Sequence, residues 1–239
     1  MSIRPLVLAV SCVLGCAALV EMPVGAQAAA GSSVTGTIKF EGTAPRPQRL
    51  RMTSDPLCVP DAKGTTSETL IVAKDGGIQN VFVYVKDGLG GKTFPPPKTP
   101  ITVDQKGCRY IPHVFGVQAG QPVIIKNSDP AVHNVNATAE VNRGFNLIQP
   151  KGAKPSTRTF DKPEIMVPFR CDVHPWMASW GGVVSHPFFA VSSENGTFEI
   201  KGLPAGTYTI EAWHEQLGTQ TQKVTVTAKG ASASFTYKK

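Results

Sequence analysis

Residues 169–177 read FRCDVHPWM, a stretch that places a thiol, an imidazole and a thioether within seven positions. Cys171, His174 and Met177 are each three residues apart, and Pro175 stiffens the chain directly after the histidine. The flanking runs, IMVPFRC and GGVVS, predict that the stretch is a tight loop between two β-strands. A cysteine beside two other soft or borderline donors in such a loop indicates a metal site rather than an ordinary buried thiol.

A fourth donor must come from another part of the chain, because the loop supplies only three. His133 is the candidate, since it lies in NSDPAVHNV, just past the strand-like run PVIIKN. A thiolate, two imidazoles and a weak axial thioether form the donor set of blue-copper sites. We therefore predict one type 1 copper ion bound by His133, Cys171, His174 and Met177. Zinc also binds cysteine and histidine, but a methionine in the set favours copper.

The rest of the chain predicts an all-β fold. It contains 23 Gly and 20 Pro among 239 residues, and its apolar runs are short and separated by turn residues. Residues 101–184 hold such runs at a spacing typical of a β-sandwich, and residues 186–239 predict a meander of further strands. Residues 86–100 (KDGLGGKTFPPPKTP) are so rich in Gly and Pro that we expect a linker and a domain boundary there.

The N-terminal segment, residues 1–28, has the pattern of a secretory signal peptide. Arg4 precedes an apolar run at 6–20, and the segment ends in the small-residue motif AQA, so we expect cleavage after Ala28. An imperfect lipobox ending at Cys16 leaves lipoprotein processing as the alternative. Either route predicts a periplasmic or secreted protein with no transmembrane segment in the mature chain.

Removal of residues 1–28 leaves three cysteines, which is an odd number. Cys58 and Cys108 lie in polar, loop-like surroundings (DPLCVPD and DQKGCRY), and we expect them to form a disulfide in an oxidising compartment. Cys171 is then the unpaired thiol, and a bound metal would protect it.

The loop at 171–177 resembles the ligand loop of the cupredoxins of the amicyanin and plastocyanin type, with tryptophan in place of an aromatic phenylalanine. Residues 110–127 are similar to the cupredoxin pattern of aromatic-x-Pro, Val-x-Ala-Gly and an Asn-ended strand, and residues 133–135 resemble the loop with the first histidine ligand. The resemblance covers residues 101–185. It implies a Greek-key β-sandwich and the four copper ligands given above, with Asn134 bracing the cysteine loop.

The same resemblance implies that the edge of His174 faces solvent and passes electrons. His113 has no counterpart in the cupredoxin pattern; it either approaches the copper or only hydrogen-bonds within its loop. The segment of residues 137–163 is longer and more polar than we expect for the connection between the two ligand segments of a cupredoxin.

A second resemblance concerns residues 196–215, GTFEIKGLPAGTYTIEAWHE, which are similar to the carboxypeptidase-regulatory or transthyretin-like β-sandwich. The early runs VTGTIKFEG and IQNVFVYV look like opening strands of that sandwich. The resemblance implies one discontinuous sandwich from residues 31–94 and 186–239, with a cupredoxin domain at 95–185 inserted and the Cys58–Cys108 bridge joining the two. The rival layout is an elaborated N-terminal cupredoxin followed by a small C-terminal module.

These features favour an exported copper protein that carries single electrons between redox partner proteins, such as a cytochrome or a dehydrogenase. The alternatives are a periplasmic copper carrier or sensor, and a β-sandwich binding module without a redox role. An enzyme is not expected, because four protein ligands leave no open coordination position.

The remaining histidines and the charge point to no further chemistry. We expect structural roles for His186 and His214, and packing roles for Trp176 and Trp180. The net charge is +7, but the basic residues are scattered, so we expect a solvated surface and no nucleic-acid partner.

Overall fold

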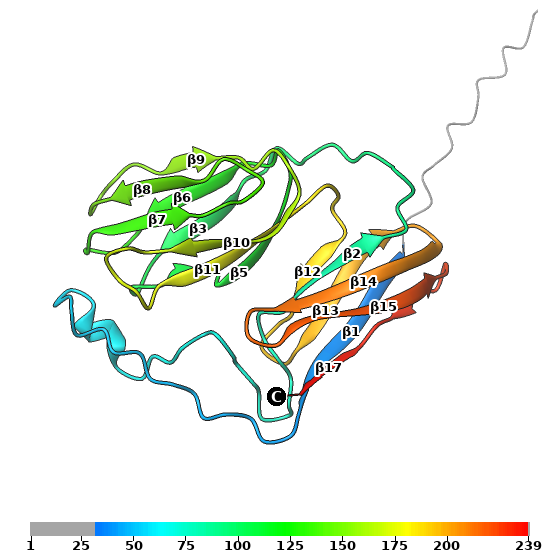
Figure 1. The fold of residues 1–239 in the computed structure, drawn as a ribbon, viewed down its shortest axis with the longest axis horizontal. Helices are drawn as coiled ribbons and strands as arrows, with labels where there is room; N and C mark the ends of the chain where they lie inside the picture. The colour runs from blue at the N-terminus through cyan, green and yellow to red at the C-terminus, as the bar shows by residue number, and fades with distance from the viewer. Residues whose placement is uncertain (1–31, 239) are drawn as a thin grey trace, which may run out of the picture.

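The computed structural model describes residues 32–238, so the predicted signal peptide and Cys16 lie outside the described part. The fold is all-β, as predicted, with one short 3-10 turn, η1 (Val59–Ala62). The strands form four sheets, which pack in pairs as two sandwiches lying side by side (Figure 1). No helix in the described part is long and apolar enough to cross a membrane.

The first sandwich holds one sheet in the order β5-β11-β10-β7-β8 and a second in the order β4-β3-β6-β9. Antiparallel pairs dominate, but β3 runs parallel to β6 and β5 runs parallel to β11. Its strands are β3 (Ile101–Gln105), β4 (Tyr110–Ile111), β5 (Val114–Gln118), β6 (Val123–Asn127), β7 (His133–Ala137), β8 (Phe145–Gln149), β9 (Ser156–Arg158), β10 (Glu164–Arg170) and β11 (Ala178–Val184). Alternate apolar side chains such as Val103, Ile125 and Phe169 fill the space between the sheets.

The second sandwich has the sheet orders β13-β1-β16 and β12-β2-β14-β15, and β17 also pairs with β1. Its strands are β1 (Ser32–Glu41), β2 (Phe82–Asp87), β12 (Phe189–Val191), β13 (Thr197–Leu203), β14 (Gly206–His214), β15 (Gly218–Val226), β16 (Ala231–Ser232) and β17 (Phe235–Lys238). The strands β1 and β2 precede the first sandwich in sequence, yet they pair with strands that follow it. A separate core including Ile38, Val83, Ile200 and Ile210 fills this sandwich.

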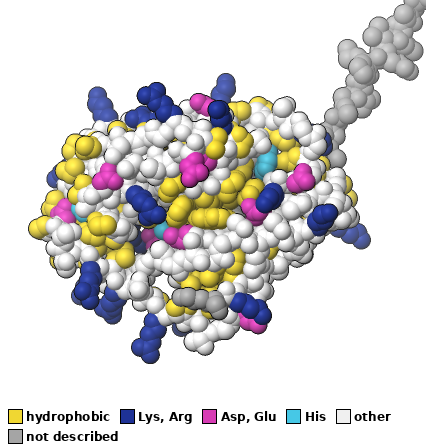
Figure 2. Space-filling model, in the orientation of Figure 1, with side chains coloured by type: hydrophobic (Ala, Val, Ile, Leu, Met, Phe, Trp, Pro, Cys, Tyr) yellow, Lys and Arg dark blue, Asp and Glu magenta, His cyan; other side chains and the backbone are white. Residues whose placement is uncertain are grey.

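The segment between β1 and β2 and an apolar seam join the two sandwiches. Residues 42–81 leave β1, extend along the end of the first sandwich and return to β2 (Figure 1). At the seam, Phe82 of β2 packs with Val114 of β5 and Val184 of β11 in a third apolar cluster. On the face shown in Figure 2, Lys and Arg side chains are spread around the molecule rather than gathered in one patch, in agreement with a solvated basic surface.

Candidate metal centre

The predicted ligands meet at one edge of the first sandwich. His133 is the first residue of β7, and Cys171 follows the last residue of β10. These two strands are antiparallel neighbours, with Arg170 paired to Asn136, so the start of one lies beside the end of the other. His174 lies in the loop that follows, and Met177 directly precedes β11.

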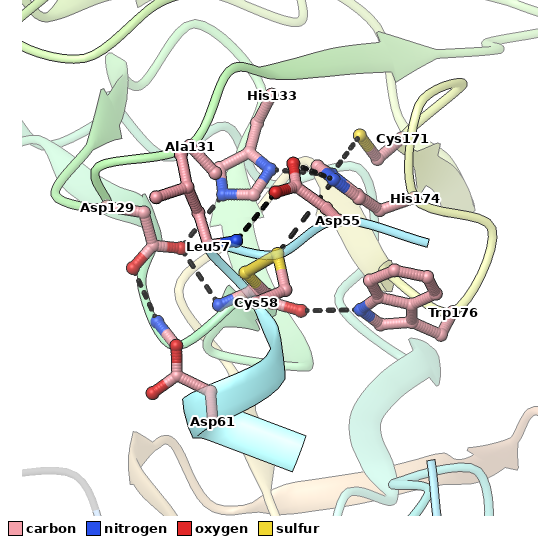
Figure 3. The surroundings of a disulfide bond; sticks show 12 residues. Asp55, Leu57, Cys58, Asp61, Asp129, Ala131, His133, Cys171, His174 and Trp176 are labelled. Carbon is pink, nitrogen blue, oxygen red and sulfur yellow. Dashed lines mark hydrogen bonds and ion pairs between the residues drawn. A yellow bond between two sulfur atoms is a disulfide. The ribbon is translucent and has the colours of Figure 1, made fainter. Parts of the chain in front are cut away.

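Three of the four predicted ligands form a compact cluster of donor atoms. The Nδ1 atoms of His133 and His174 are 2.9 Å apart, and the Cys171 Sγ lies 3.6 Å from Nδ1 of His174. All three donor atoms lie within 4.8 Å of one another, and all three residues are buried. The dashed contacts among these side chains can be followed in Figure 3. The arrangement is a convergent set of two imidazoles and one thiol.

Met177 closes the ligand loop. Its backbone N–H donates to the His174 carbonyl at 2.9 Å, and its own carbonyl accepts from the Cys171 N–H at 3.3 Å. The side chain is 1% exposed and belongs to the core of the first sandwich. These two hydrogen bonds therefore close the loop around Cys171 and His174, and the Met177 side chain is buried with the core of the first sandwich.

Each histidine is oriented by a carboxylate on its outer nitrogen. Nε2 of His133 is 2.8 Å from Oδ2 of Asp129, and Nε2 of His174 is 3.1 Å from Oδ2 of Asp55. An Nε2–H that donates to a carboxylate leaves the lone pair on Nδ1, so both lone pairs point into the cluster. Two such lone pairs 2.9 Å apart repel each other unless a cation or a proton lies between them. The donor set therefore fits a metal ion.

The pKa values show what this cluster does without a metal. Burial lowers the pKa of His133, but hydrogen bonds to Asp129 and Cys171 outweigh it and raise that pKa to about 9. Burial raises the pKa of the Cys171 thiol, but hydrogen bonding to His133 and nearby backbone amides brings it down to about 6. At neutral pH the metal-free cluster is therefore an imidazolium and thiolate pair, and a metal would displace the proton.

Asn134 braces the cysteine loop, at the position where the sequence resemblance implied such a residue. The Asp172 N–H donates to Oδ1 of Asn134 at 2.7 Å, and the same oxygen lies 3.3 Å from Sγ of Cys171. The Asp172 carboxylate in turn accepts from the side-chain amides of Asn134, Asn136 and Asn146. The loop is therefore fastened to β7 and β8 directly after the cysteine.

The expectation that His174 faces solvent is wrong. Its side chain is only 1% exposed, because residues between β1 and β2 lie over it. Asp55 occupies the outer nitrogen, and Sγ of Cys58 lies 3.8 Å from the same nitrogen. The centroids of the Trp176 and His174 rings are 5.0 Å apart. Figure 3 shows both side chains near the disulfide.

The predicted disulfide is confirmed. Cys58 and Cys108 are bonded across a sequence separation of 50 residues, and Cys171 is the free cysteine of the described residues. The bridge ties the segment between β1 and β2 to the loop between β3 and β4, next to the metal centre. The Trp176 Nε1–H donates to the Cys108 carbonyl at 3.0 Å, so the ligand loop is also hydrogen-bonded to a cysteine of the disulfide.

His113 lies outside the cluster. Its Nε2 is 2.5 Å from Oε1 of Glu215, and its Nδ1 is 3.0 Å from the Ala178 carbonyl. It thus connects the first sandwich with the end of β14 rather than approaching the cysteine.

Two carboxylates at the site were not foreseen from sequence. Asp129 lies four residues before His133, and that spacing in a turn-rich loop was an available signal. Asp55 is 119 residues from His174, and nothing in the sequence connects them.

Comparison with protein families gives one partial match and no curated relative. Residues 180–234 match the family described as polysaccharide lyase family 4, domain II. This match falls in the region that resembled the transthyretin-like sandwich, and that resemblance stays unconfirmed. No curated protein sequence matches the chain.

Among solved structures, the similar chains include cupredoxins. An amicyanin variant in the Cu(I) form is 22% identical over 42% of this chain and 97% of that chain, with a TM-score of 0.31. A purple cupredoxin from Nitrosopumilus maritimus is 17% identical over 35% and 98%, with a TM-score of 0.30. The copper-containing nitrite reductase NirK from Thermus scotoductus SA-01 is 24% identical over 40% of this chain, with a TM-score of 0.31, and the match spans 24% of that enzyme. At these scores the function must be argued from the site itself.

Proposed function

We propose that this chain is an exported type 1 copper protein that transfers single electrons between redox partner proteins and catalyses no reaction of its own. The observation that carries the proposal is the convergence of two imidazole Nδ1 atoms and one thiol, all buried, at the end of a β-sandwich. Copper bound there would supply a one-electron couple between Cu(I) and Cu(II). His133, Cys171 and His174 would hold it, with Met177 as the axial donor.

The protein's part in such a site is to keep the donors still. His133 is fixed by Asp129, and the chain at Cys171 is fixed by the Asn134 side chain, which accepts from the Asp172 N–H, and by the backbone of Met177. Donors held on two strand ends of a packed sandwich need little reorganisation when the metal changes charge. The arrangement also supports export, because a buried disulfide beside the site belongs in an oxidising compartment.

One observation favours a second candidate function, a periplasmic copper carrier or store. The buried His174 offers no imidazole edge to a partner, whereas a carrier needs a closed and slowly exchanging site. The two functions predict different rates of electron transfer and of copper release. Both rates can be measured on one preparation.

The test is the spectrum of the purified protein on addition of Cu(II), followed by cycles of reduction and reoxidation. We expect a strong visible thiolate-to-copper band, reversible on reduction, that is absent in Cys171→Ser and in His133→Ala. His113→Ala is the matched control, since it removes a buried histidine outside the cluster and should leave the band unchanged. Met177→Ala should shift the band and the potential.

A colourless complex would overturn the type 1 assignment. A coloured complex that a cytochrome or a small redox dye oxidises only very slowly would support the carrier over the electron-transfer protein.

A further inference from the structure

The loop that covers His174 is part of the metal centre, although it comes from a distant part of the sequence. We propose that Asp55 is a positioning residue for His174, and that the loop carrying Asp55 is a closed cover that slows entry and release of the metal. The Cys58–Cys108 disulfide holds this loop in place. We define the cover loop as residues 48–67. As far as it concerns copper, this inference rests on the proposed function.

The tip of the cover loop makes direct contact with the metal centre. Oδ2 of Asp55 is 3.1 Å from Nε2 of His174, while its Oδ1 accepts from the Leu57 N–H at 2.8 Å. Sγ of Cys58 lies 3.8 Å from the same imidazole nitrogen. Together these contacts leave His174 only 1% exposed, so the metal centre is closed on this side by the cover loop.

The hydrogen bond that Asp55 accepts from His174 has a specific chemical consequence. It fixes Nε2 as the protonated nitrogen of His174 and turns Nδ1 toward Cys171 and His133. A carboxylate on the outer nitrogen also makes the inner nitrogen a better donor to a metal. Asp129 does the same for His133 from within the first sandwich. The two histidines thus have equivalent partners, of which one is supplied by the sandwich and the other by the cover loop.

The cover loop depends on few attachments. Among the described residues, its backbone hydrogen bonds are internal: Leu50 donates to Thr65, and Ser67 donates to Gln48. No strand of the first sandwich pairs with it in that part of the chain. What holds it down is the buried side chain of Met52, with Leu50 and Ala62 partly buried against the same core, and the covalent bond from Cys58 to Cys108.

The disulfide is also linked to the other histidine. Oδ2 of Asp129 accepts from the Cys108 N–H at 2.8 Å and contacts Nε2 of His133 at 2.8 Å. The backbone of Cys108 is therefore hydrogen-bonded to the same carboxylate that orients His133, while Cys58 lies in the cover loop together with Asp55. Loss of the bridge would free the cover loop but leave the Asp129 contacts in place.

The test measures the transfer of Cu(I) from the loaded protein to the chelator bicinchoninate. Asp55→Asn removes the negative charge and leaves one acceptor oxygen for the Leu57 N–H and the His174 Nε2–H, so transfer should be roughly tenfold faster than from the wild type. The double variant Cys58→Ser, Cys108→Ser should be faster still, because the loop then loses its covalent anchor.

Asp75→Asn is the matched control. Oδ1 of Asp75 accepts from the N–H two residues on, that of Gly77, as Asp55 does with Leu57, but its other oxygen pairs with Lys39 of β1. Transfer from this variant should proceed at the wild-type rate.

A second readout needs no metal. In the metal-free protein, alkylation of Cys171 at about pH 9, above the ordinary thiol pKa, should be slow in the wild type and faster in Asp55→Asn. The modified residue is identified by peptide mapping.

The outcomes separate the two proposals. A wild-type protein that binds no copper, but whose Cys171 is protected by the cover loop, would overturn the proposed function alone. A protein that binds copper and releases it at the same rate in all variants, with equal alkylation of Cys171, would overturn the cover. If the double serine variant fails to fold, Asp55→Asn against Asp75→Asn decides.

Discussion

The two sandwiches use buried histidine in opposite ways. In the first sandwich, the Asp129 and Cys171 partners of His133 raise its pKa to about 9, although burial alone would lower it. In the second sandwich, burial lowers the pKa of His186, and it lowers the pKa of His214 to about 4. All three side chains are buried, so burial does not explain the difference.

The partners explain it. Nε2 of His186 donates to the Val85 carbonyl at 2.8 Å, and Nδ1 of His214 accepts from the N–H groups of Gln216 and Leu217. Backbone groups of this kind satisfy a neutral imidazole, which is one donor and one acceptor, and they supply no charge. Carboxylate and thiolate partners favour the imidazolium instead. The comparison shows that a buried histidine is a candidate for chemistry when its partners are anionic.

The largest effect is expected from removing the anion beside His133. Asp129→Ala deletes the acceptor for Nε2 of His133 and for the N–H groups of Gly107 and Cys108, and the contacts to His133 and Cys108 are buried. We expect the free energy of unfolding of the metal-free protein to fall by about 3–5 kcal/mol. Chemical denaturation measures it.

Asp104→Ala is the control within the same sandwich. Asp104 pairs with Lys126 near the surface, at 3.2 Å, and its loss should cost about 1 kcal/mol or less. Equal losses in the two variants would contradict the view that Asp129 has a special role.

Sequence patterns were sufficient for the parts of the site that are local. The spacing of Cys171, His174 and Met177 put them in one loop between strands, and the structure places that loop where β10 ends and β11 begins. The pairing of Cys58 with Cys108 followed from counting cysteines. The strands were recognisable because short apolar runs bounded by turn residues are too short for buried helices and are typical of β-strands. The domain boundaries remain a prediction.

What sequence could not supply depends on how distant segments pack. The contact of Asp55 with His174 spans 119 residues, and that of His113 with Glu215 spans 102. Neither residue lies in a motif, since each contact exists only because a loop passes over another part of the fold. The mistaken expectation of an exposed His174 has this cause: a resemblance limited to residues 101–185 contains no information about the segment that covers the loop.

The next effect concerns acid and the second sandwich. Because the pKa of His214 falls to about 4 on folding, the unfolded state binds more protons between that value and about 6.5. Stability should be fully present above about pH 6.5 and decrease as pH falls toward 4, by up to roughly 3 kcal/mol. In His214→Asn, whose Oδ1 can accept the same two N–H bonds and does not titrate, this loss should disappear.

Unfolding curves of both proteins between about pH 4 and pH 8 test it. A decrease of the same size in the variant would show that His214 is not its source. His133 has the opposite sign, since its raised pKa gives stability below about pH 6.5 that is lost as pH rises through about 9.

The smallest effect lies at the seam, where a carboxylate of the second sandwich meets a histidine of the first. Burial lowers the pKa of His113, but the hydrogen bond to Glu215 outweighs it and leaves the pKa raised. Glu215 also accepts from the Trp180 N–H at 3.1 Å, and Glu68 adds its charge from the segment between β1 and β2. The charge of Glu215 thus stabilises the fold more while His113 is protonated than when His113 is neutral.

We expect Glu215→Gln, which keeps an acceptor but loses the charge, to cost about 1 kcal/mol below pH 6. The cost should shrink as pH rises through the raised pKa of His113, since the wild type loses the same contribution there. Denaturation of both proteins at about pH 5.5 and pH 8.5 measures the difference. A cost that is equal at the two pH values would mean that Glu215 acts through packing and its bond to Trp180. His113 would then resemble the histidines of the second sandwich, whose partners are backbone groups, rather than the histidines of the metal centre, whose partners are anions.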